Sequence, residues 1–293
     1  MKFLVTGSAG LIGRQVVKDT STQNYQIHAS YHETKPEFGM PIRLDLTNLN
    51  EISKVMNKTK PDSVIHLAAL TNVDLCETQK DLAMKINAKS TEILAKEAAK
   101  HDSFFLYVST DYVFDGNQGM KKETDKTNPL GFYGKSKLEG EKALYNLASS
   151  WCIARTSTPF GTHPTKKSFP LWIIENLKQK KEIKVITDQF TSPTYIPNLS
   201  KMLIEIATKQ LVGIYHVAGA SKISRYNLAE LIAEKMEIDK KLLKPITMDE
   251  MKWQAQRPKD SSLDVSKAST ILNEKPKKIE ESIDLFLTDL EKL

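Results

Sequence analysis

The chain has 293 residues, of which 40% are hydrophobic and 27% charged, and its formal net charge is +6. This balance fits a globular protein of one large lobe and a smaller one, and the apolar runs are too short to span a bilayer. The lysines are scattered, the two cysteines are far apart, and the histidines lack ligand spacing, so we expect no nucleic-acid surface, no disulfide framework and no metal site. With no membrane segment and no signal peptide before Gly7, we expect a cytoplasmic protein.

Short apolar runs alternate with amphipathic segments through the first half of the chain. The runs predicted as buried strands are Lys2–Thr6, Gln26–Tyr31, Ser63–Leu67, Phe104–Ser109 and Trp151–Arg155. Helical spacing of apolar residues predicts helices over Leu82–Lys100 and Lys135–Ala148. This alternation is typical of an α/β fold with a doubly wound parallel sheet (Rossmann type), in which ligands bind beyond the carboxyl ends of the strands.

A glycine-rich turn follows the first predicted strand. The spacing is GxxGxxG, and a helical pattern over Arg14–Lys18 comes next. Such a turn lets the backbone approach the diphosphate of a dinucleotide, and the following helix offers unpaired N–H groups to it. The alternative is a turn that only packs the helix closely on the strand. The cofactor contacts predicted here are Gly7, Ala9, Gly10, Leu11, Ile12 and Gly13.

Three further positions bear on which dinucleotide is bound. The second strand ends at Tyr31-His32, without the carboxylate that binds the ribose of NAD. Arg14 can meet a 2′-phosphate, although a solvated helix position is the alternative. These features favour NADPH, and NADH stays possible because Glu33 lies one position farther on. Asp45, followed by Leu46, is expected at the adenine or, alternatively, as a cap before Thr47.

A hydroxyl residue at a strand end and a YxxxK pattern predict reductase chemistry. Thr110 comes directly after the predicted strand Phe104–Ser109, and Tyr133 and Lys137 lie four residues apart on one face of a predicted helix. A phenol titrates near pH 10, so it exchanges protons at neutral pH only when positive charge stabilises the phenolate, and Lys137 is expected to supply that charge. Tyr133 would then protonate a carbonyl oxygen that Thr110 holds. The alternative is an exposed tyrosine beside a solvated lysine.

The second half of the chain changes character after Arg155. We expect an irregular loop at 158–164, a helix over Phe169–Lys178, a strand near 213–217, and helices over Tyr226–Met236 and Ile279–Leu290. The predicted domains are a dinucleotide-binding domain, 1–156 and 188–217, and a smaller substrate-binding lobe, 157–187 and 218–293.

Long ordered motifs carry a resemblance to a known family. They are the runs Val108–Gly116 and Asn128–Lys142, followed by Asp188-Gln189-Phe190, Pro193-Thr194-Tyr195 and Arg257–Asp264. In these residues, and nearly end to end, the chain resembles the extended short-chain dehydrogenases/reductases, and among them the dTDP-4-dehydrorhamnose reductase group. Two departures from the group's pattern are Phe160, in a loop that often carries tryptophan, and Thr191, where glycine is frequent.

The resemblance implies roles for particular residues. Thr110, Tyr133 and Lys137 would be catalytic; Thr110 would also contact the substrate, and Tyr133 and Lys137 the cofactor, with Lys137 holding the nicotinamide ribose. Ala68, Ala69, Asn87 and Ser109 would lie along the cofactor, and Asn87 would also support the lysine. Thr71, Val73 and Asp74 would lie near the sugar, the alternative being a turn that initiates a helix. Gln189 and Thr194 would lie on the substrate side, and Arg257 would pair with the diphosphate of a nucleotide sugar, the alternative being a surface ion pair.

The implied activity is NAD(P)H-dependent reduction of the 4-keto group of a nucleotide-activated deoxy-sugar, with dTDP-4-dehydro-L-rhamnose as the leading substrate and a homodimer as the expected assembly. A second resemblance, at 213–216, 244–247 and 255–258, is to the regulatory β subunit of methionine adenosyltransferase. The alternatives that stay open are therefore an NADP-binding regulatory subunit and a related sugar-nucleotide epimerase.

Overall fold

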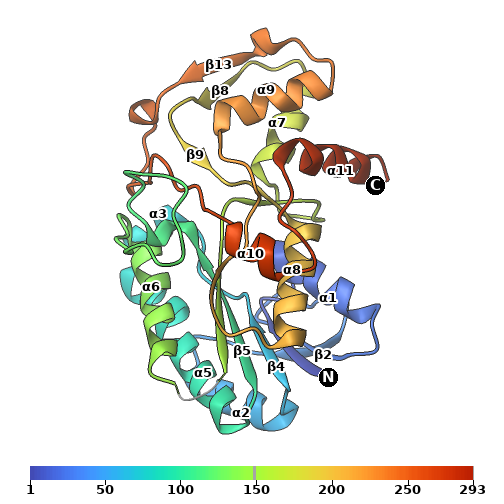
Figure 1. Cartoon of the computed structure of the whole chain (residues 1–293), viewed down its shortest axis with the longest axis vertical. Coiled ribbons are helices and arrows are strands. Elements are labelled where there is room, and N and C mark those ends of the chain that lie inside the picture. Colours follow the sequence, from blue (N-terminus) through green and yellow to red (C-terminus); the bar gives the residue numbers. More distant parts are fainter. Residues whose placement is uncertain (148–149, 293) are drawn as a thin grey trace.

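A parallel sheet forms the centre of the larger part of the molecule. The computed structural model describes residues 1–147 and 150–292, and within them seven strands take the spatial order β11-β6-β5-β4-β1-β2-β3 (Figure 1). Their bounds are β1 Lys2–Thr6, β2 Gln26–Tyr31, β3 Met40–Arg43, β4 Ser63–His66, β5 Phe104–Thr110, β6 Trp151–Thr156 and β11 Gly213–His216. Every pair in this sheet is parallel. The predicted α/β class with a doubly wound sheet is confirmed.

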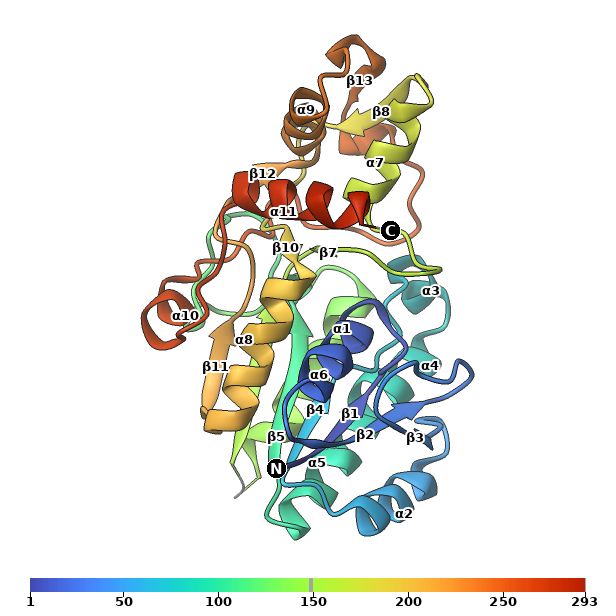
Figure 2. The ribbon, with the colours of Figure 1, turned by 90° about the vertical axis from the view of Figure 1, so that its right-hand side faces the viewer.

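Helices cover both faces of this sheet, and each face has its own core. One face carries α1 Leu11–Ser21, α8 Ile196–Lys209 and α10 Ser266–Ile271, and the other carries α2 Leu49–Thr59, α5 Ser90–Lys100 and α6 Phe132–Tyr145 (Figures 1 and 2). Val16 and Leu199 are among the buried residues of the first core, and Ile52 and Leu94 are among those of the second. Because both faces are covered, the strands are apolar throughout rather than alternating.

The strand order reverses beside β1, where ligands are expected in a sheet of this kind. β1 pairs with β2 on one side and with β4 on the other, with Phe3 opposite Ile27 and Ser63. The connections leaving β1 and β4 therefore diverge to opposite faces, and a crevice is expected at the carboxyl ends of these two strands.

The helix expected over Leu82–Lys100 is interrupted. The segment consists of α4 Lys80–Met84, a π-helical turn η1 Lys85–Lys89 and α5. The expected single helix is therefore wrong in this detail, because a wider i→i+5 turn interrupts the α-helical hydrogen bonds over five residues of a segment that is helical throughout. The helix expected over Lys135–Ala148 begins earlier and ends at Tyr145, and Ala148 lies outside the described residues.

Several elements were not expected from the sequence. The 14-residue helix α8 begins with Pro197 near its first position, and its buried face includes Leu199, Met202 and Leu203. Helix α2 and strand β3 also lie in segments for which no element was expected. The loop expected at 158–164 contains β7 Pro159–Phe160, which pairs in parallel with β10 Thr194–Tyr195.

A second group of elements packs around its own core at the carboxyl-end side of the sheet (Figure 2). It comprises α7 Phe169–Lys178, α9 Arg225–Lys235, α11 Ile279–Glu291 and the parallel pair β8 Ile183–Ile186 and β13 Leu243–Ile246, with β9 Phe190–Thr191 and β12 Ile223–Ser224 pairing nearby. Short elements complete the chain: α3 Val73–Thr78, η2 Asp111–Val113, η3 Lys240–Leu242 and η4 Met248–Glu250.

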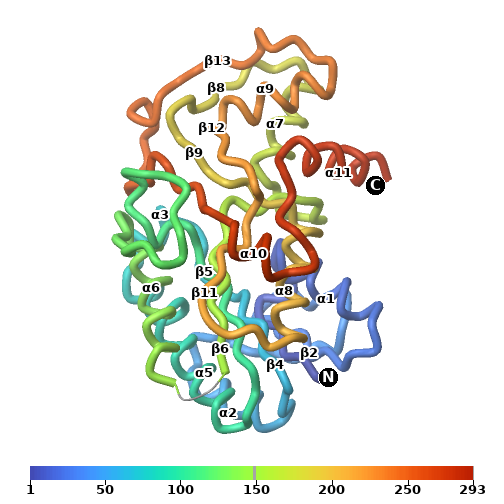
Figure 3. Tube along the Cα trace, in the orientation of Figure 1, coloured from blue at the N-terminus to red at the C-terminus, as the bar shows by residue number. Residues whose placement is uncertain are grey.

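The chain passes between the two groups several times (Figure 3). The predicted domain boundaries stay a prediction. Helix α10, which lies within the predicted smaller lobe, contacts the main sheet, since Ala268 and Leu272 belong to the core beside α1 and α8. The ranges also include residues 148, 149 and 293, which lie outside the described residues. In the part of the chain that the structure describes, no helix is long and apolar enough to cross a membrane.

Candidate active site

The glycine-rich turn after β1 is packed so tightly that its glycines cannot be replaced without movement. Gly7 has φ +66°, and a Cβ on it would lie 2.9 Å from the Cα of Ala68. A Cβ on Gly13 would lie 2.1 Å from the carbonyl oxygen of Gly7. Helix α1 starts at Leu11 after Gly10, without a side-chain cap, so its first N–H groups are available to a ligand. The turn therefore packs α1 closely on β1 and also leaves N–H groups free for an anion. The two interpretations of the sequence, a packing turn and a dinucleotide-binding turn, are compatible with each other.

Threonine and histidine side chains join the glycine turn to the end of β4. Thr6 Oγ1 accepts hydrogen bonds from the N–H groups of Leu67 and Ala68, both at 3.1 Å, and bonds to His66 Nδ1 at 2.7 Å. Ala68 and Ala69 are partly exposed on the connection that leaves β4. The structure thus brings the predicted cofactor contacts of β1 and β4 together at the point where the strand order reverses.

The residues expected to select the dinucleotide have partners of their own. Arg14 forms an ion pair with Glu37 at 2.6 Å, and its guanidinium lies over the ring of Phe38. Asp45 accepts hydrogen bonds from the N–H and hydroxyl of Thr47, and these bonds lower its pKa. Asp45 therefore caps its turn, which was the alternative expected, and Leu46 beside it is buried.

Thr110 at the end of β5 takes part in a buried network centred on Asp111. Thr110 Oγ1 donates to Asp111 Oδ1 at 2.9 Å and accepts from the N–H of Tyr112 at 3.2 Å. Asp111 Oδ2 accepts from the hydroxyls of Ser157 at 2.7 Å and Ser261 at 2.6 Å. Burial raises the pKa of Asp111, and these three hydroxyl hydrogen bonds act in the opposite direction. A hydroxyl has one proton, so Thr110 keeps a lone pair free while its proton is directed to Asp111.

Tyr133 and Lys137 lie on α6, one helical turn apart, at the same strand end. Lys137 is buried, donates to the carbonyl of Val108 at 2.9 Å and lies over the ring of Tyr107. Burial lowers the pKa of Lys137 to about 7, although the charge of Glu141 acts in the opposite direction. A solvated lysine, which was the alternative expected from the sequence, is therefore not found.

The pKa of Tyr133 lies above its ordinary value, not below it. Burial is the main cause, the hydrogen bond with Thr110 opposes it, and the charge of Asp111 adds to it. The expected lowering of the pKa by Lys137 is not found among the main causes, because the lysine ammonium is directed at Val108 and Tyr107. Tyr133 instead contacts Tyr112 edge to face.

Asn87 connects the β4 connection to α6 directly beside Lys137. Its Oδ1 accepts from the N–H of Leu70 at 2.7 Å, and its Nδ2 donates to the carbonyl of Leu70 and to Ser136 Oγ, both at 3.0 Å. Asn87 lies in the π-helical turn η1, whose wider geometry places this side chain toward α6. Ser109 on β5 is buried, and its hydroxyl has no hydrogen-bond partner among the described residues. A cradle of glycines and an unpartnered hydroxyl at the same edge fit a bound dinucleotide.

The segment expected near the sugar begins helix α3. Thr71 precedes the helix, Val73 is its first residue, and the Asn72 side chain caps it by accepting from the N–H of Leu75 at 3.0 Å. Asp74 forms a two-pronged ion pair with Arg257, with Nη2 to Oδ2 at 2.8 Å and Nη1 to Oδ1 at 3.1 Å.

Arg257 therefore has a carboxylate partner, as the alternative expected, yet its side chain is only 12% exposed. The guanidinium also lies over the ring of Trp253. The pKa of Asp74 is lowered to about 2, mainly by the hydrogen bond from Arg257. The pair joins α3 to the late segment around residue 257.

Gln189 and Thr194 are both fully buried. Gln189 accepts from the Nε of Arg225 and donates to the carbonyl of Pro258 at 3.4 Å, and Thr194 donates to the carbonyl of Ser157 at 2.7 Å. The structure places these two side chains in the framework that connects the late segments rather than on an open surface.

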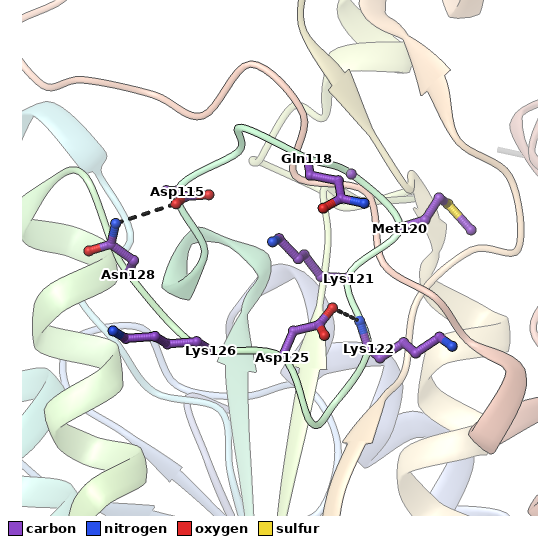
Figure 4. A pocket seen from close by; sticks show the side chains of 9 residues that line it. Asp115, Gln118, Met120, Lys121, Lys122, Asp125, Lys126 and Asn128 are labelled. Atoms are coloured by element: carbon purple, nitrogen blue, oxygen red, sulfur yellow. Dashed lines mark hydrogen bonds between the residues drawn. The ribbon is translucent and has the colours of Figure 1, made fainter.

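Two cavities lie beside this region. One, of about 890 Å³, is lined by Arg257 and Trp253 together with Asp115, Phe190 and other residues of the late segments. The other, of about 540 Å³, is formed by the loop that follows η2 and has a polar, lysine-rich lining without any of the predicted site residues (Figure 4). Asp115 borders both cavities and bonds to Asn128.

Sequence reasoning missed three groups that the structure brings to this site. Asp111 and Tyr112 stood inside a recognised motif but received no role, so their position next to Thr110 was the available signal. The Trp253 ring that stacks on Arg257 stands four residues before it and was equally visible. The contact of His163 Nε2 with the carbonyl of Ala9 had no local signal, because the two residues are 154 positions apart.

Comparison with known proteins gives consistent results. The chain matches the RmlD substrate binding domain family over residues 1–292. It is 35% identical to a dTDP-4-dehydrorhamnose reductase of Aggregatibacter actinomycetemcomitans over 91% of each chain, and 30% identical to methionine adenosyltransferase 2 subunit beta of Bos taurus over 92% of this chain and 82% of that protein. The crystal structure of dTDP-4-dehydrorhamnose reductase from Bacillus anthracis in complex with NADP is similar, with a TM-score of 0.87, 29% identity, and coverage of 98% of this chain and 99% of that one.

Proposed function

The chain belongs to the RmlD substrate binding domain family, and from this premise we propose that it reduces the 4-keto group of a nucleotide-activated deoxy-sugar. The proposed reaction converts dTDP-4-dehydro-L-rhamnose to dTDP-L-rhamnose with NADPH, and NADH is a possible second donor. The observation that carries the proposal is the convergence of Tyr133, Lys137 and Thr110 at one strand end beside the glycine turn. The reductase relatives and the NADP in one of their structures support the same activity and cofactor.

We propose that main-chain groups and a few side chains bind the cofactor. The turn Gly7–Gly13 and the start of α1 would receive the diphosphate, and Ala68, Ala69 and Ser109 would line its path along the strand ends. Arg14 would meet a 2′-phosphate by exchanging its partner Glu37, and Asp45 with Leu46 would lie at the adenine. The nicotinamide, when bound, supplies the hydride that carbon 4 of the sugar receives.

The chain itself would handle the proton. Tyr133 would donate its phenolic proton to oxygen 4 as the ketone is reduced, since a neutral phenol of raised pKa holds that proton firmly until a basic oxygen forms. Lys137, whose pKa of about 7 lets it hold or release a proton near neutrality, would restore the tyrosine. Asn87 would keep α6 and the β4 connection in register around the lysine.

Thr110 would position the carbonyl, but its hydrogen bond to Asp111 limits when it can donate a proton. While its proton is directed to Asp111, Thr110 can only accept a hydrogen bond, so that proton would have to turn away from Asp111 before Thr110 could donate to the carbonyl or to Tyr133. Contact with the sugar ketone would therefore compete with Asp111 for the one Thr110 proton. For the sugar nucleotide we propose the cavity lined by Arg257, with Thr71 and Val73 contacting the sugar and Gln189 supporting the segment around Arg257 through its bond to Pro258.

An activity assay tests the proposal. Purified protein is mixed with dTDP-4-keto-6-deoxy-sugar, the matching epimerase, and NADPH or NADH in turn, and the loss of nicotinamide absorbance is followed. We expect oxidation of the reduced cofactor that depends on both the sugar nucleotide and this protein. Absence of turnover with both cofactors would remove the reductase proposal.

A regulatory role is the second candidate, favoured by the 30% identity to methionine adenosyltransferase 2 subunit beta. Affinity capture from the native cell separates the two candidates, because a regulatory subunit would bring down an adenosyltransferase in stoichiometric amount. A cytoplasmic location and a homodimer are part of the reductase proposal and rest on the family resemblance. Size-exclusion chromatography with light scattering tests the homodimer.

A further inference from the structure

The segment between β7 and α7 reaches across to the glycine turn. In Figure 2 this segment lies between the sheet and the second group of elements. His163 Nε2 lies 3.2 Å from the carbonyl oxygen of Ala9, which belongs to the turn predicted to receive a diphosphate. The contact joins two parts of the chain that come from the two different groups of elements.

Hydrogen bonds fix the protonation of the His163 ring. Nδ1 accepts from the N–H of Thr165 at 3.1 Å and of Lys166 at 3.0 Å. A ring nitrogen that accepts carries no proton, so the proton is on Nε2 and is donated to Ala9. The ring is therefore neutral, which agrees with a pKa lowered first by burial and further by the charges of Lys166 and Arg14. His163 thus holds residues 163–166 as a turn against the glycine turn.

This turn places the ammonium of Lys166 over the start of α1. A Cβ built on Gly10 would lie 3.9 Å from Lys166 Nζ. None of the ion pairs in residues 1–147 and 150–292 includes Lys166, whereas its neighbour Lys167 pairs with Glu175 at 2.7 Å. An unpaired cation beside the positive end of a helix is unfavourable on its own, and an anion between the two relieves the repulsion.

We propose that Lys166 is a further cofactor-binding residue, whose ammonium pairs with the diphosphate of the dinucleotide and which His163 positions over Gly10. The inference rests on the proposed function, because it assigns a contact within the same site. It adds a contact from the segment after β7 to a diphosphate site otherwise built from main-chain N–H groups. The bound dinucleotide thereby joins the two groups of elements.

Cofactor binding to the full chain tests the assignment without any turnover. The Kd values of NADPH, NADH and ADP-ribose, and of dTDP as a substrate-side ligand, are measured by calorimetry for wild type, Lys166→Ala and the matched control Lys167→Ala. Loss of one charge-assisted contact from the exposed Lys166 should raise the Kd values of NADPH, NADH and ADP-ribose about tenfold in Lys166→Ala, and Lys167→Ala should bind as wild type does. The tenfold difference should shrink at high salt, because the contact is screened. His163→Ala should also weaken binding, since the turn that carries the lysine loses its anchor.

The ligands separate the possible sources of an effect. A loss confined to NADPH would place Lys166 at the 2′-phosphate, and a loss seen only with dTDP would place it at the substrate, so either result overturns the assignment. Equal Kd values for Lys166→Ala and wild type also overturn it while the proposed function stands. If wild type binds none of the dinucleotides, both fail, and unchanged circular dichroism of each variant shows that folding is not the cause.

Discussion

Thr110 donates its single hydroxyl proton to Asp111, and this limits the other hydrogen bonds that Thr110 can form. The Thr110 hydroxyl donates to a carboxylate that two serine hydroxyls also contact, so its direction is set by Asp111 rather than by the site's opening. Asp111 pairs with no cation among residues 1–147 and 150–292, so its burial is costly, and the hydroxyl hydrogen bonds offset part of that cost. The orientation of the Thr110 hydroxyl, which the sequence predicts to be catalytic, is therefore set by Asp111, for which the sequence predicted no role.

Replacing Tyr133 by phenylalanine tests the proton donor. We expect turnover to fall by about two orders of magnitude, because a general acid contributes on that scale, while NADPH binds with unchanged Kd. Steady-state kinetics and calorimetry measure the two quantities. Tyr145→Phe is the control, since Tyr145 is 46% exposed at the far end of the same helix. Turnover of Tyr133→Phe at the wild-type rate would remove Tyr133 from the chemistry.

Replacing Asp111 by asparagine tests the direction of the Thr110 hydroxyl. The amide offers one acceptor oxygen where the carboxylate offered two, so the three hydroxyl donors can no longer all be satisfied. We expect kcat to fall about tenfold, the effect of disturbing one charged hydrogen bond, with little change in the Kd of NADPH. The pH dependence of kcat should also change shape, which a loss of stability alone would not produce. An unchanged pH profile in Asp111→Asn would contradict this role.

At the scale of elements, a buried ion pair fixes α6 to the sheet. Arg155 at the end of β6 donates from Nε and Nη2 to the two carboxylate oxygens of Glu141, at 3.0 and 2.7 Å. Both side chains are at most 2% exposed. Because α6 also carries Tyr133 and Lys137, this pair holds the two proposed catalytic side chains in place at the strand ends.

Glu141→Gln should strongly destabilise the protein. Removing one partner leaves the Arg155 charge buried and uncompensated, which costs about 3–5 kcal/mol of the free energy of unfolding. Urea denaturation measures that loss. On the same helix, Glu139 and Lys142 form an exposed pair, so Glu139→Gln should change the free energy by less than about 1 kcal/mol. Equal effects of the two substitutions would show that the buried pair does not anchor α6.

The π-helical turn η1 is short, but its geometry determines the direction of the Asn87 side chain. It orients Asn87, whose side chain bonds to Leu70 in the connection after β4 and to Ser136 in α6. A regular α-helix over the same residues would rotate this side chain by part of a turn and lose at least one of these bonds. The interruption of the helix is therefore a positioning device for α6.

At the scale of the whole molecule, buried histidines make folding depend on pH. His66 lies in the centre of the sheet with hydrogen bonds to Thr6 and Thr91, and burial lowers its pKa to about 3. Between pH 6.5 and 3 the unfolded chain binds a proton at this residue that the folded chain does not. Stability is therefore full above pH 6.5 and declines as the pH falls through this window.

Urea denaturation at several pH values between 7 and 5 checks this dependence. We expect the free energy of unfolding to fall by up to about 1.4 kcal/mol per pH unit for His66 in this range, which lies above the titration of most carboxylates. His66→Gln should fold less stably at pH 7 but show a weaker pH dependence. A slope as steep in His66→Gln as in wild type would place the effect elsewhere.

The division of the molecule into lobes is also decided at this scale. The predicted ranges 1–156 with 188–217, and 157–187 with 218–293, are retained as a proposal. Helix α10 lies in the second range but packs on the core beside α1 and α8, so residues after 218 contribute to both groups of elements.

The sequence by itself determined what depends on local spacing. Alternating apolar runs and helical periodicity predicted the parallel sheet, and the glycine turn and YxxxK pattern identified residues that the structure brings to one edge. The apolar spacing within α8 is also helical, although no element was predicted there.

Only the tertiary structure decided which partners those residues have. The pairing of Arg257 with Asp74, the burial of Gln189, the control of Thr110 by Asp111 and the placing of Lys166 over Gly10 join positions that are distant in sequence or compete for one proton. Periodicity records how a residue relates to its own helix or strand, whereas hydrogen bonds and charges depend on the distances that folding sets between elements.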